Sequence, residues 1–409
     1  MHLSGYAWAM NSKQTFQYVS TPEALENACH VLKQSKVLFV DTEFHREKTY
    51  YPEFALLQIG TYEVCYIIDP IALQDLKPVW DVMLNPDVLK VFHAARQDLE
   101  IILQHAGALP LPLFDTQIAA ALLGYGQQVG FGNLVQRLAK KLLAKGESFS
   151  DWLHRPLTEQ QLKYAADDVI YLVPVYQALK EELQAKKRYA WLDEEQGILT
   201  SISTYQIEPH EMFWRVKGNN KLKPKQLAIL RELTAWREKQ AQKKDIPRRR
   251  LISDEALIEL AKRDQLDIDV MGRMRGLNAG VIRRFGQTWL DLWNKGRACP
   301  EEDHPKFATR KHNTPGSDLR LELLDTLVRL KAEESSISST ILSNKSDLAA
   351  LASWGYKPQT DAPDVPCLHG WRYELVGEDL LHLLRGELCL RIEPSTGLPV
   401  IDRKKDTSV

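Results

Sequence analysis

The sequence predicts an α/β domain followed by two all-α domains. Short apolar runs with strand character are concentrated between residues 36 and 183, where they alternate with helical patterns. After about residue 190 the strand patterns fade. Helical periodicities replace them, separated by Pro224, Pro247 and a glycine-containing stretch at 272–280. A chain of 409 residues is also too long for one compact core, so several domains are expected.

Five strands and the helices between them are expected in the α/β part. Residues 37–40 are a short apolar run that ends in acids, as in a central strand whose carboxyl edge is polar. Other strands are expected at 54–59 and 64–68 (a hairpin around Gly60-Thr61), 88–92 and 113–115, with helices following through residue 104 and over 116–123.

A further helix is expected to begin at Thr158. Gln161, three residues later, completes a capping box with this threonine. The helix runs past Tyr164 and Asp168, and Pro174 is expected to kink or interrupt it, because proline cannot continue the backbone hydrogen-bond ladder.

The composition is that of a globular protein without a membrane-spanning segment. Hydrophobic residues make up 44% and charged residues 26%, and there is no run of about 18 apolar residues. The first residues lack a secretion signal, and Met10 is an alternative start. The scattered cysteines show no CxxC spacing, which argues against structural zinc and favours reduced thiols in a cytoplasmic protein. They are Cys29, Cys65, Cys299, Cys367 and Cys389.

Charge is distributed unevenly along the chain. The net charge is −1, but residues 221–300 hold 19 Lys and Arg against 10 Asp and Glu, a local +9 that leaves −10 for the remainder. A basic module attached to an acidic one is a pattern typical of proteins that bind nucleic acid through one part.

Two carboxylates, Asp41 and Glu43, lie two residues apart on the expected central strand. Alternation along a strand directs both to the same face. Two like charges packed at a buried sheet edge are unfavourable unless a positive charge neutralises them, and Mg²⁺ or Mn²⁺ prefers such oxygen ligands. For this pair alone, a solvated acidic strand end is an equal alternative.

The other acidic segments are ambiguous when each is taken alone. Asp98 falls at the start of the helix after the 88–92 strand, where a helix-start charge is the simpler interpretation. Tyr164 and Asp168 are four residues apart and share a helix face, whereas Asp167 points about 100° away. Core packing with a wet hydroxyl would by itself explain Tyr164.

Combined in this order, the motifs resemble those of the DEDD exonuclease superfamily, in its tyrosine-containing subgroup. The three motifs are DTEF at 41–44, HAARQDL at 93–99 and YAADD at 164–168. The resemblance covers residue 16 to about residue 185 and extends through TYYPEFALLQIG (49–60), FDTQIAAALLG (114–124) and SDWLHRPLTEQQL (150–162). The Tyr-x-x-x-Asp spacing of the subgroup selects Asp168 rather than Asp167.

The resemblance implies a ribonuclease-H-like α/β domain, with a mixed sheet flanked by helices. It also implies hydrolysis with two divalent cations, Mg²⁺ or Mn²⁺, roughly 3.5–4 Å apart. It implies that Asp41 bridges both ions, that Glu43 and Asp168 help to hold the ion carrying the attacking water, and that Asp98 serves the other ion mainly through waters. It further implies that Tyr164 positions the water and that 5′-mononucleotides are released.

Several neighbouring residues are assigned supporting roles. Asp115 is expected to cap the helix that begins at Thr116. His93, Phe44 and Gln58 are candidates for substrate contact, although a packed strand-end histidine is the more ordinary interpretation of His93.

Two basic residues after the first motif, Arg46 and Lys48, are either solvated charges or phosphate contacts, and the sequence leaves both alternatives open.

The helical half resembles known modules. The stretch LKPKQLAILRELTAWREKQAQKKDIPRRRLISDEALIELAKR (222–263) resembles the HRDC domain, a helical module of certain helicases and of ribonuclease D. Its basic residues are either a solvated loop or RNA phosphate contacts. These are Lys243, Lys244, Arg248, Arg249 and Arg250.

A second helical segment, 318–388, resembles a diverged second HRDC domain through WGYK (354–357) and GWRYELVGEDLLHLL (370–384). Leu319, Leu323, Leu327 and Leu330 are expected to share one face, with Trp354 and Trp371 anchoring a small core, and residues 402–409 to form a disordered tail. The expected domains are 16–190, 215–297 and 318–390, with a linker at 298–317.

This order of domains resembles the ribonuclease D family. It implies a cytoplasmic 3′→5′ exoribonuclease that processes the 3′ ends of precursor tRNA, without a membrane or an evident protein partner. No helicase P-loop occurs. A 3′→5′ DNA exonuclease on the same site and a non-catalytic RNA-binding protein are the alternatives, because contacts to the 2′-hydroxyl are not readable from sequence.

Overall fold

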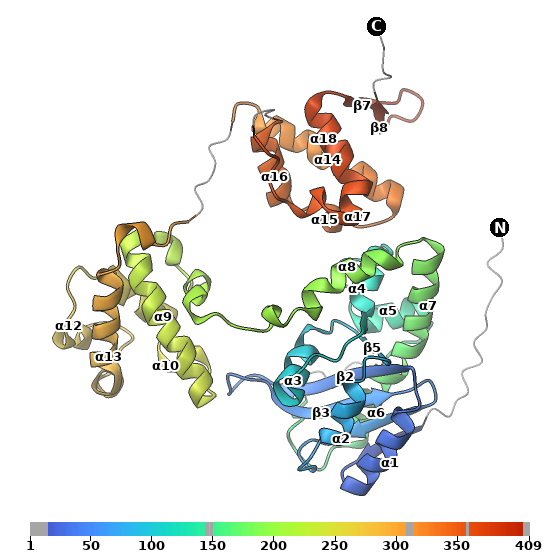
Figure 1. The fold of residues 1–409 in the computed structure, drawn as a ribbon, viewed down its shortest axis with the longest axis horizontal. Coiled ribbons are helices and arrows are strands. Elements are labelled where there is room, and N and C mark those ends of the chain that lie inside the picture. Colours follow the sequence, from blue (N-terminus) through green and yellow to red (C-terminus); the bar gives the residue numbers. More distant parts are fainter. Residues whose placement is uncertain (1–14, 144–146, 148–149, 308–313, 357–359, 404–409) are drawn as a thin grey trace. The chain divides into compact units, whose positions relative to one another are not determined.

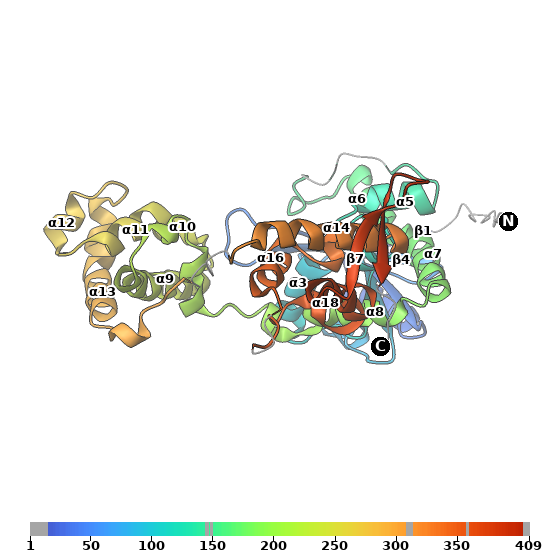
Figure 2. The ribbon, with the colours of Figure 1, turned by 90° about the horizontal axis from the view of Figure 1, so that it is seen from above.

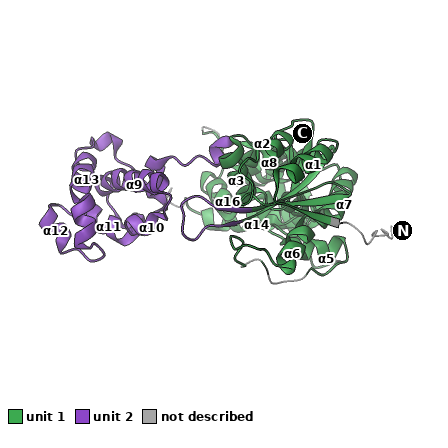
Figure 3. Cartoon of the chain, turned by 90° about the horizontal axis from the view of Figure 1, so that it is seen from below, with its two compact units in different colours: residues 1–43, 56–201, 311–409 green, residues 44–55, 202–310 purple. Residues whose placement is uncertain are grey.

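The protein is described by a computed structural model, which covers residues 15–143, 147, 150–307, 314–356 and 360–403. The chain divides into two compact units (Figure 3). Unit 1 contains residues 1–43, 56–201 and 311–409, and unit 2 contains residues 44–55 and 202–310. Each unit is therefore built from segments that lie far apart in the sequence.

A six-stranded mixed sheet is the centre of the α/β domain (Figure 1). The strand order is β1-β4-β3-β2-β5-β6; β1 and β4 are parallel, β3 and β4 are antiparallel, and β2, β5 and β6 are parallel. The strands are β1 (Thr15–Val19), β2 (Val37–His45), β3 (Glu53–Gly60), β4 (Val64–Ile68), β5 (Leu89–Phe92) and β6 (Leu113–Asp115). The five expected strands are confirmed, and β1 is an addition.

Eight helices complete the described part of this domain. They are α1 (Pro22–Leu32), α2 (Lys77–Met83), α3 (Arg96–Ala106), α4 (Thr116–Leu122), α5 (Phe131–Leu138), α6 (Glu159–Ile170), α7 (Leu172–Ala185) and α8 (Tyr189–Thr200). The capping box at the start of α6 is confirmed: the Thr158 side chain accepts from the backbone of Gln161, whose side chain accepts from the backbone of Thr158. The break between α6 and α7 falls three residues before Pro174, as expected.

The first half of β2 is buried on both faces. Leu38, Phe39 and Val40 are fully buried, and the Phe39 ring makes an edge contact with Tyr176 of α7 at 5.8 Å between centroids. Apolar side chains on both faces are the signature of a strand covered by helices on each side of the sheet. This burial fixes the register of β2 and so determines which residues emerge at its carboxyl end.

Unit 2 is helical, apart from residues 44–55. Its core is formed around Trp289 and Trp293, against which Leu230 and Leu257 pack. Its helices are the 3-10 turns η1 (Ile202–Thr204), η2 (Pro209–Arg215), η3 (Asn219–Lys221) and η4 (Glu301–Asp303), with α9 (Pro224–Lys244), α10 (Arg248–Leu251), α11 (Asp254–Lys262), α12 (Ile268–Gly272) and α13 (Ala279–Arg297).

The C-terminal segment of unit 1 is helical and ends in a hairpin. Its elements are α14 (Ser317–Ser335), α15 (Ser339–Leu342), α16 (Lys345–Trp354), η5 (Pro366–Leu368), α17 (Gly370–Arg372), the π-helical turn η6 (Tyr373–Gly377), α18 (Glu378–Arg385), β7 (Leu388–Ile392) and β8 (Pro399–Arg403). Strands β7 and β8 pair antiparallel.

Two expectations for this segment are wrong. Leu319 and Leu323 are 68% and 48% exposed, because α14 buries the face that carries Leu324, Leu327 and Val328 instead. Residues 402 and 403 belong to β8, since the hairpin with β7 satisfies their backbone; residues 404–409 lie outside the described part.

The C-terminal segment packs on the end of the α/β domain, over α8 (Figures 1 and 2). The Trp371 ring stacks on Trp191 of α8 at 4.6 Å between centroids, and Arg372 forms an ion pair with Glu195. Arg188, at the start of α8, donates a 2.6 Å hydrogen bond to the Ser335 carbonyl. Trp371 is 3% exposed, so its expected burial is confirmed, but it packs against Trp191 of the α/β domain.

Within the described ranges, none of the helices combines the length and the apolar character that crossing a bilayer requires.

Candidate active site

Strand β2 supplies the first two acidic side chains of the site. Asp41 and Glu43 follow its buried half, and both are partly buried, while Thr42 between them is 5% exposed. Because side chains alternate along a strand, the two carboxylates point to one face and Thr42 to the other.

Helix α3 contributes Asp98 in its first turn. The side chain is 6% exposed, and the Thr42 hydroxyl donates a short hydrogen bond to Asp98 Oδ1. No role is assigned to Thr42 from the sequence. Its position between two acids on a strand could have indicated one, because a buried hydroxyl needs a hydrogen-bond partner.

Helix α6 contributes Asp168, one turn after Tyr164. One carboxylate oxygen each from Asp41, Glu43 and Asp168 lie within 4.8 Å of one another. Asp98 is not in this tight group, although its charge acts on Glu43. Asp167 is also outside the group, which contains Asp168.

The crowding of these acids has electrostatic consequences. The pKa of Glu43 is raised to about 10, first by burial and then by the charges of Asp41 and Asp168. Burial, and then the charge of Asp168, hold the pKa of Asp41 well above its usual range, and burial with the charge of Asp41 does the same for Asp98. Carboxylates placed this way resist ionisation unless a cation neutralises them.

The pKa of Asp168 is raised less, to about 7. Burial raises it, and a hydrogen bond from the Tyr164 side chain lowers it by favouring the charged form. The Tyr164 ring also lies 6.0 Å from the Trp152 ring, which is buried. Tyr164 is thus held in place on one side and bonded to a ligand candidate on the other.

The donor set fits a hard divalent cation. Carboxylate oxygens alone make up the cluster, and such ligands suit Mg²⁺ or Mn²⁺, whereas a structural zinc site favours sulfur and imidazole. The raised pKa values indicate that the cluster is short of positive charge, which a cation would supply.

Asp115 holds the turn of the second motif. Its carboxylate accepts from the backbone N–H groups of Ala94 (3.1 Å) and Ala95 (2.9 Å), and it caps α4 through Gln117 and Ile118. Ala94 has a φ of +60°, a conformation that costs energy in a residue with a side chain. The expected capping role of Asp115 is confirmed, and its bonds to the second motif are an addition.

His93 is packed between two polar partners and a ring. Its Nδ1 lies 2.9 Å from the Thr116 hydroxyl, its Nε2 lies 3.1 Å from the Val129 carbonyl, and its ring is 5.3 Å from Phe131. Burial lowers its pKa. His93 is therefore a neutral, fixed residue at the end of β5.

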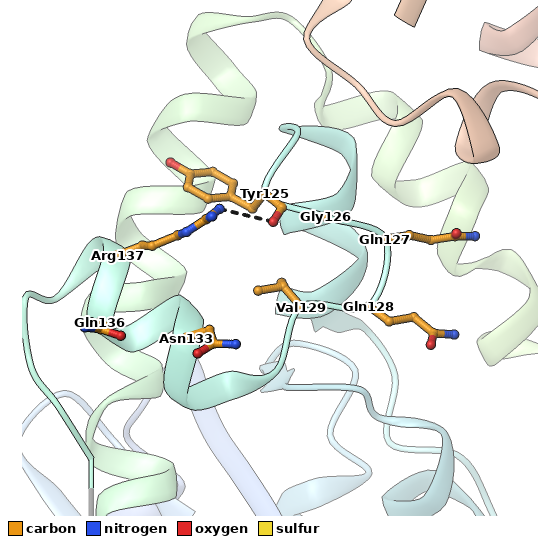
Figure 4. A pocket seen from close by; sticks show the side chains of 8 residues that line it. All are labelled: Tyr125, Gly126, Gln127, Gln128, Val129, Asn133, Gln136 and Arg137. Carbon is orange, nitrogen blue, oxygen red and sulfur yellow. Dashed lines mark hydrogen bonds between the residues drawn. The ribbon is translucent and has the colours of Figure 1, made fainter. Parts of the chain in front are cut away.

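The loop after α4, bonded to His93 through Val129, borders a polar cavity of about 590 Å³ (Figure 4). Arg137 of α5 donates to the Tyr125 carbonyl across it, at 3.2 Å. The lining is Tyr125, Gly126, Gln127, Gln128, Val129, Asn133, Gln136 and Arg137. No role is assigned to residues 125–130 from the sequence, although the glycines at 124, 126 and 130 are typical of a loop.

The other candidate substrate residues are dispersed. Gln58 on β3 is fully buried, and its amide has no hydrogen-bond partner among the described residues. Phe44 is partly buried at the end of β2. The basic residues of 243–250 lie in unit 2, where Lys244 lies over the Phe285 ring at 4.7 Å and Arg248 and Arg249 form ion pairs.

Comparison with known proteins identifies the family. Residues 16–184 match the model of a 3′-5′ exonuclease family, and residues 226–292 match that of the HRDC domain. A ribonuclease D from Granulibacter bethesdensis is 39% identical over 381 residues, covering 92% of this chain and 94% of the relative. A ribonuclease D from Bartonella henselae is 37% identical over 392 residues, covering 95% and 93%. The chain belongs to the ribonuclease D family.

A solved structure agrees with this assignment. The crystal structure of Escherichia coli RNase D, described as an exoribonuclease involved in structured RNA processing, covers 91% of this chain and 99% of its own, with a TM-score of 0.77 and 33% identity. As a ribonuclease D, the chain is a 3′→5′ exoribonuclease, with a ribonuclease-H-like α/β domain and an HRDC domain, that acts on RNA. Exonucleases of this superfamily use divalent metal ions.

Proposed function

We propose that this ribonuclease D trims the 3′ ends of precursor tRNA in the cytoplasm and releases 5′-mononucleotides. The observation that carries the proposal is the convergence of three carboxylates from β2 and α6 within 4.8 Å, in a chain that belongs to a family of exoribonucleases.

We propose two Mg²⁺ or Mn²⁺ ions as cofactors, held by Asp41, Glu43, Asp98 and Asp168. When bound, such ions activate a water molecule and stabilise the charge of the leaving 3′ oxygen. The side chains that converge in the 4.8 Å group, and the raised pKa of each, support this ligand set.

Tyr164 is proposed to position the attacking water. Its hydroxyl is anchored through Asp168, so it can hold a water in line with the terminal phosphodiester without a base of its own. His93, Phe44 and Gln58 are proposed contacts of the terminal nucleotide, with His93 acting as a neutral hydrogen-bonding group.

For the domains we propose an exonuclease domain at 16–190, a first HRDC domain at 215–297, a linker at 298–317 and a diverged second HRDC domain at 318–390. The helical core around Trp289 supports the first helical module. The all-helical run from α14 to α18 supports the second.

The test compares RNA with DNA. Purified protein is given Mg²⁺ or Mn²⁺ and 3′-extended tRNA, together with RNA and DNA oligonucleotides of matched sequence. We expect shortening of the RNA substrates from the 3′ end, loss of activity in EDTA, and at least a hundredfold slower reaction in Asp41→Ala. Equal rates on DNA would favour a DNA exonuclease. Full activity of Asp41→Ala would overturn the metal site, and binding without cleavage would indicate a non-catalytic RNA-binding protein.

A further inference from the structure

An arginine-lined cavity lies within unit 2, between residues of the β2–β3 loop and the helices of the HRDC module. Its volume is about 420 Å³. Arg46 and Thr49 line it from the loop, and Arg215, Arg248 and Arg249 line it from the helical part, together with Asp254. From its sequence, Arg46 could be either a solvated charge or a phosphate contact. Its position in the lining of this cavity distinguishes it from an isolated surface charge.

The β2–β3 loop is held in place by hydrogen bonds to the helical module, so its side of the cavity is fixed. The backbone N–H groups of Tyr50 and Tyr51 both donate to Asp245 Oδ1 at 3.0 Å. The Tyr50 hydroxyl donates to Glu238, which is fully buried, and the Arg248 guanidinium lies 5.2 Å from the centre of the Tyr50 ring. Tyr50 itself is 8% exposed, so loop and helices share one small core.

The positive charge of the lining exceeds the acids that neutralise it. Asp254 is bonded to Arg237 at 2.7 Å and to Arg249 at 3.2 Å, so one carboxylate serves two guanidinium groups. Glu238 serves Arg248. Arg215 has no ion-pair partner among the residues that the structure describes. Arg46 is not counted here. The other four arginines that line the cavity carry four positive charges, and the two acids that pair with them carry two negative charges, so the net charge is +2.

An excess of guanidinium groups around a cavity favours an anion with several oxygen atoms. The planar fork of arginine donates two parallel hydrogen bonds to phosphate oxygens, and crowded cations are relieved by such a ligand. In an enzyme that acts on RNA, the anion at hand is a phosphodiester of the substrate backbone. Arg46 follows Glu43 by three residues, so chain geometry alone keeps their Cα atoms within about 11 Å.

We propose that this cavity binds a backbone phosphate of the RNA whose 3′ end is being removed. The site is independent of base identity, because only phosphate oxygens are recognised. This proposal rests on the proposed function, because the ligand is the substrate of the nuclease. It assigns a shared role in phosphate binding to Arg215 of the helical module and to Arg46 of the loop that follows β2.

The test measures RNA binding without catalysis. The full chain is titrated in EDTA with a fluorescent, unstructured 20-nucleotide RNA at several KCl concentrations, and the anisotropy gives the affinity. Loss of one phosphate contact lowers the slope of log K against log salt by about 0.7, which corresponds to about fivefold weaker binding at 0.1 M salt. We expect this change in Arg215→Ala, whose exposed side chain can be removed without unfolding, and in Arg46→Ala.

Arg275→Ala is the matched control. Arg275 is also an exposed arginine of unit 2 without an ion-pair partner in the described residues, but it does not line the cavity. We expect its salt slope to equal that of the unchanged protein, and Arg215→Lys to retain most of the slope because it keeps the charge. An unchanged slope in Arg215→Ala, or an equal loss in Arg275→Ala, overturns the proposal.

A calorimetric titration with inorganic phosphate alone distinguishes a free phosphate ion from a phosphate of the RNA backbone as the ligand of the cavity. If Arg215→Ala weakens phosphate binding but leaves RNA binding unchanged, the cavity holds a free anion and the RNA assignment is wrong. Since binding is measured without metal, a failure of the proposed catalytic function leaves this result unaffected, and the two failures can be told apart.

Discussion

The ion pair between Glu195 and Arg372 is expected to hold the C-terminal segment on α8. Arg372 Nη2 donates to Glu195 at 2.8 Å, Nη1 makes a second bond to the same carboxylate, and the Trp371 indole N–H adds a third at 2.9 Å. The two charged side chains are 16% and 20% exposed, so the pair is largely shielded from water.

Glu195→Ala removes the common acceptor of all three bonds. Breaking a buried pair costs about 3–5 kcal/mol because the remaining charge is left unpaired, and the residual exposure here places the cost near the lower value, about 3 kcal/mol. A loss of that size shifts the equilibrium between packed and released C-terminal segments by about 140-fold. The stacked rings of Trp191 and Trp371 remain and keep most molecules packed.

Hydrogen exchange followed by mass spectrometry measures this shift directly. In Glu195→Ala, peptides covering α8 and residues 366–385 should exchange up to about 140-fold faster, while peptides from β3 and β4 should not change. Asp193→Ala, which removes an exposed carboxylate from the same helix, is the control and should leave exchange unaltered. Exchange within threefold of the unchanged protein, or a coupling energy near zero in the double-mutant cycle with Arg372→Ala, would refute the reasoning.

Three further outcomes are expected. Asp168→Asn should lower the rate of RNA hydrolysis at least a hundredfold, whereas Asp167→Asn should change it less than fivefold; similar effects would contradict the choice of Asp168. The Mn²⁺ affinity of the metal-free protein, measured by calorimetry, should rise between pH 6 and pH 8, because Glu43 and Asp168, with pKa values of about 10 and about 7, must each lose a proton to bind the ion. Each of these protons lowers the affinity by up to about tenfold per pH unit below the pKa of its group. Asp115→Ala should lower the free energy of unfolding, measured in urea, by about 3 kcal/mol, because four backbone N–H groups lose their acceptor. Asp87→Ala, at an exposed site, is the control and should leave this free energy unchanged.

The α/β domain was predictable because its determinants are local. The apolar run of β2 determines a buried strand, and strand alternation then directs Asp41 and Glu43 to one face. The capping box of Thr158 determines where α6 starts, and the four-residue spacing aligns Tyr164 with Asp168. Each inference needs only neighbours within a few residues.

The parts that were missed depend on contacts between distant residues. Leu319 and Leu323 fit a helical stripe as well as Leu324 does, and only the packing of the neighbouring helices decides which stripe is buried. The bonds from Tyr50 and Tyr51 to Asp245 span about 195 residues, and no local pattern announces them. The strand β1 is short, and its pairing with β4 lies outside the reach of any local pattern.

Because the β2–β3 loop belongs to unit 2, it cannot pack in its final position until the rest of unit 2 has been synthesised. The loop is complete at residue 55, but its partners Glu238 and Asp245 and the cavity residue Asp254 leave the ribosome nearly 200 residues later. At about 5–20 residues per second, this is a delay of roughly 10–40 s. By the end of that interval all six strands of the nuclease sheet have been synthesised, while the loop still lacks its binding partners. The proposed metal ligands of the newly made enzyme are therefore synthesised before the cavity that is proposed to bind RNA is complete.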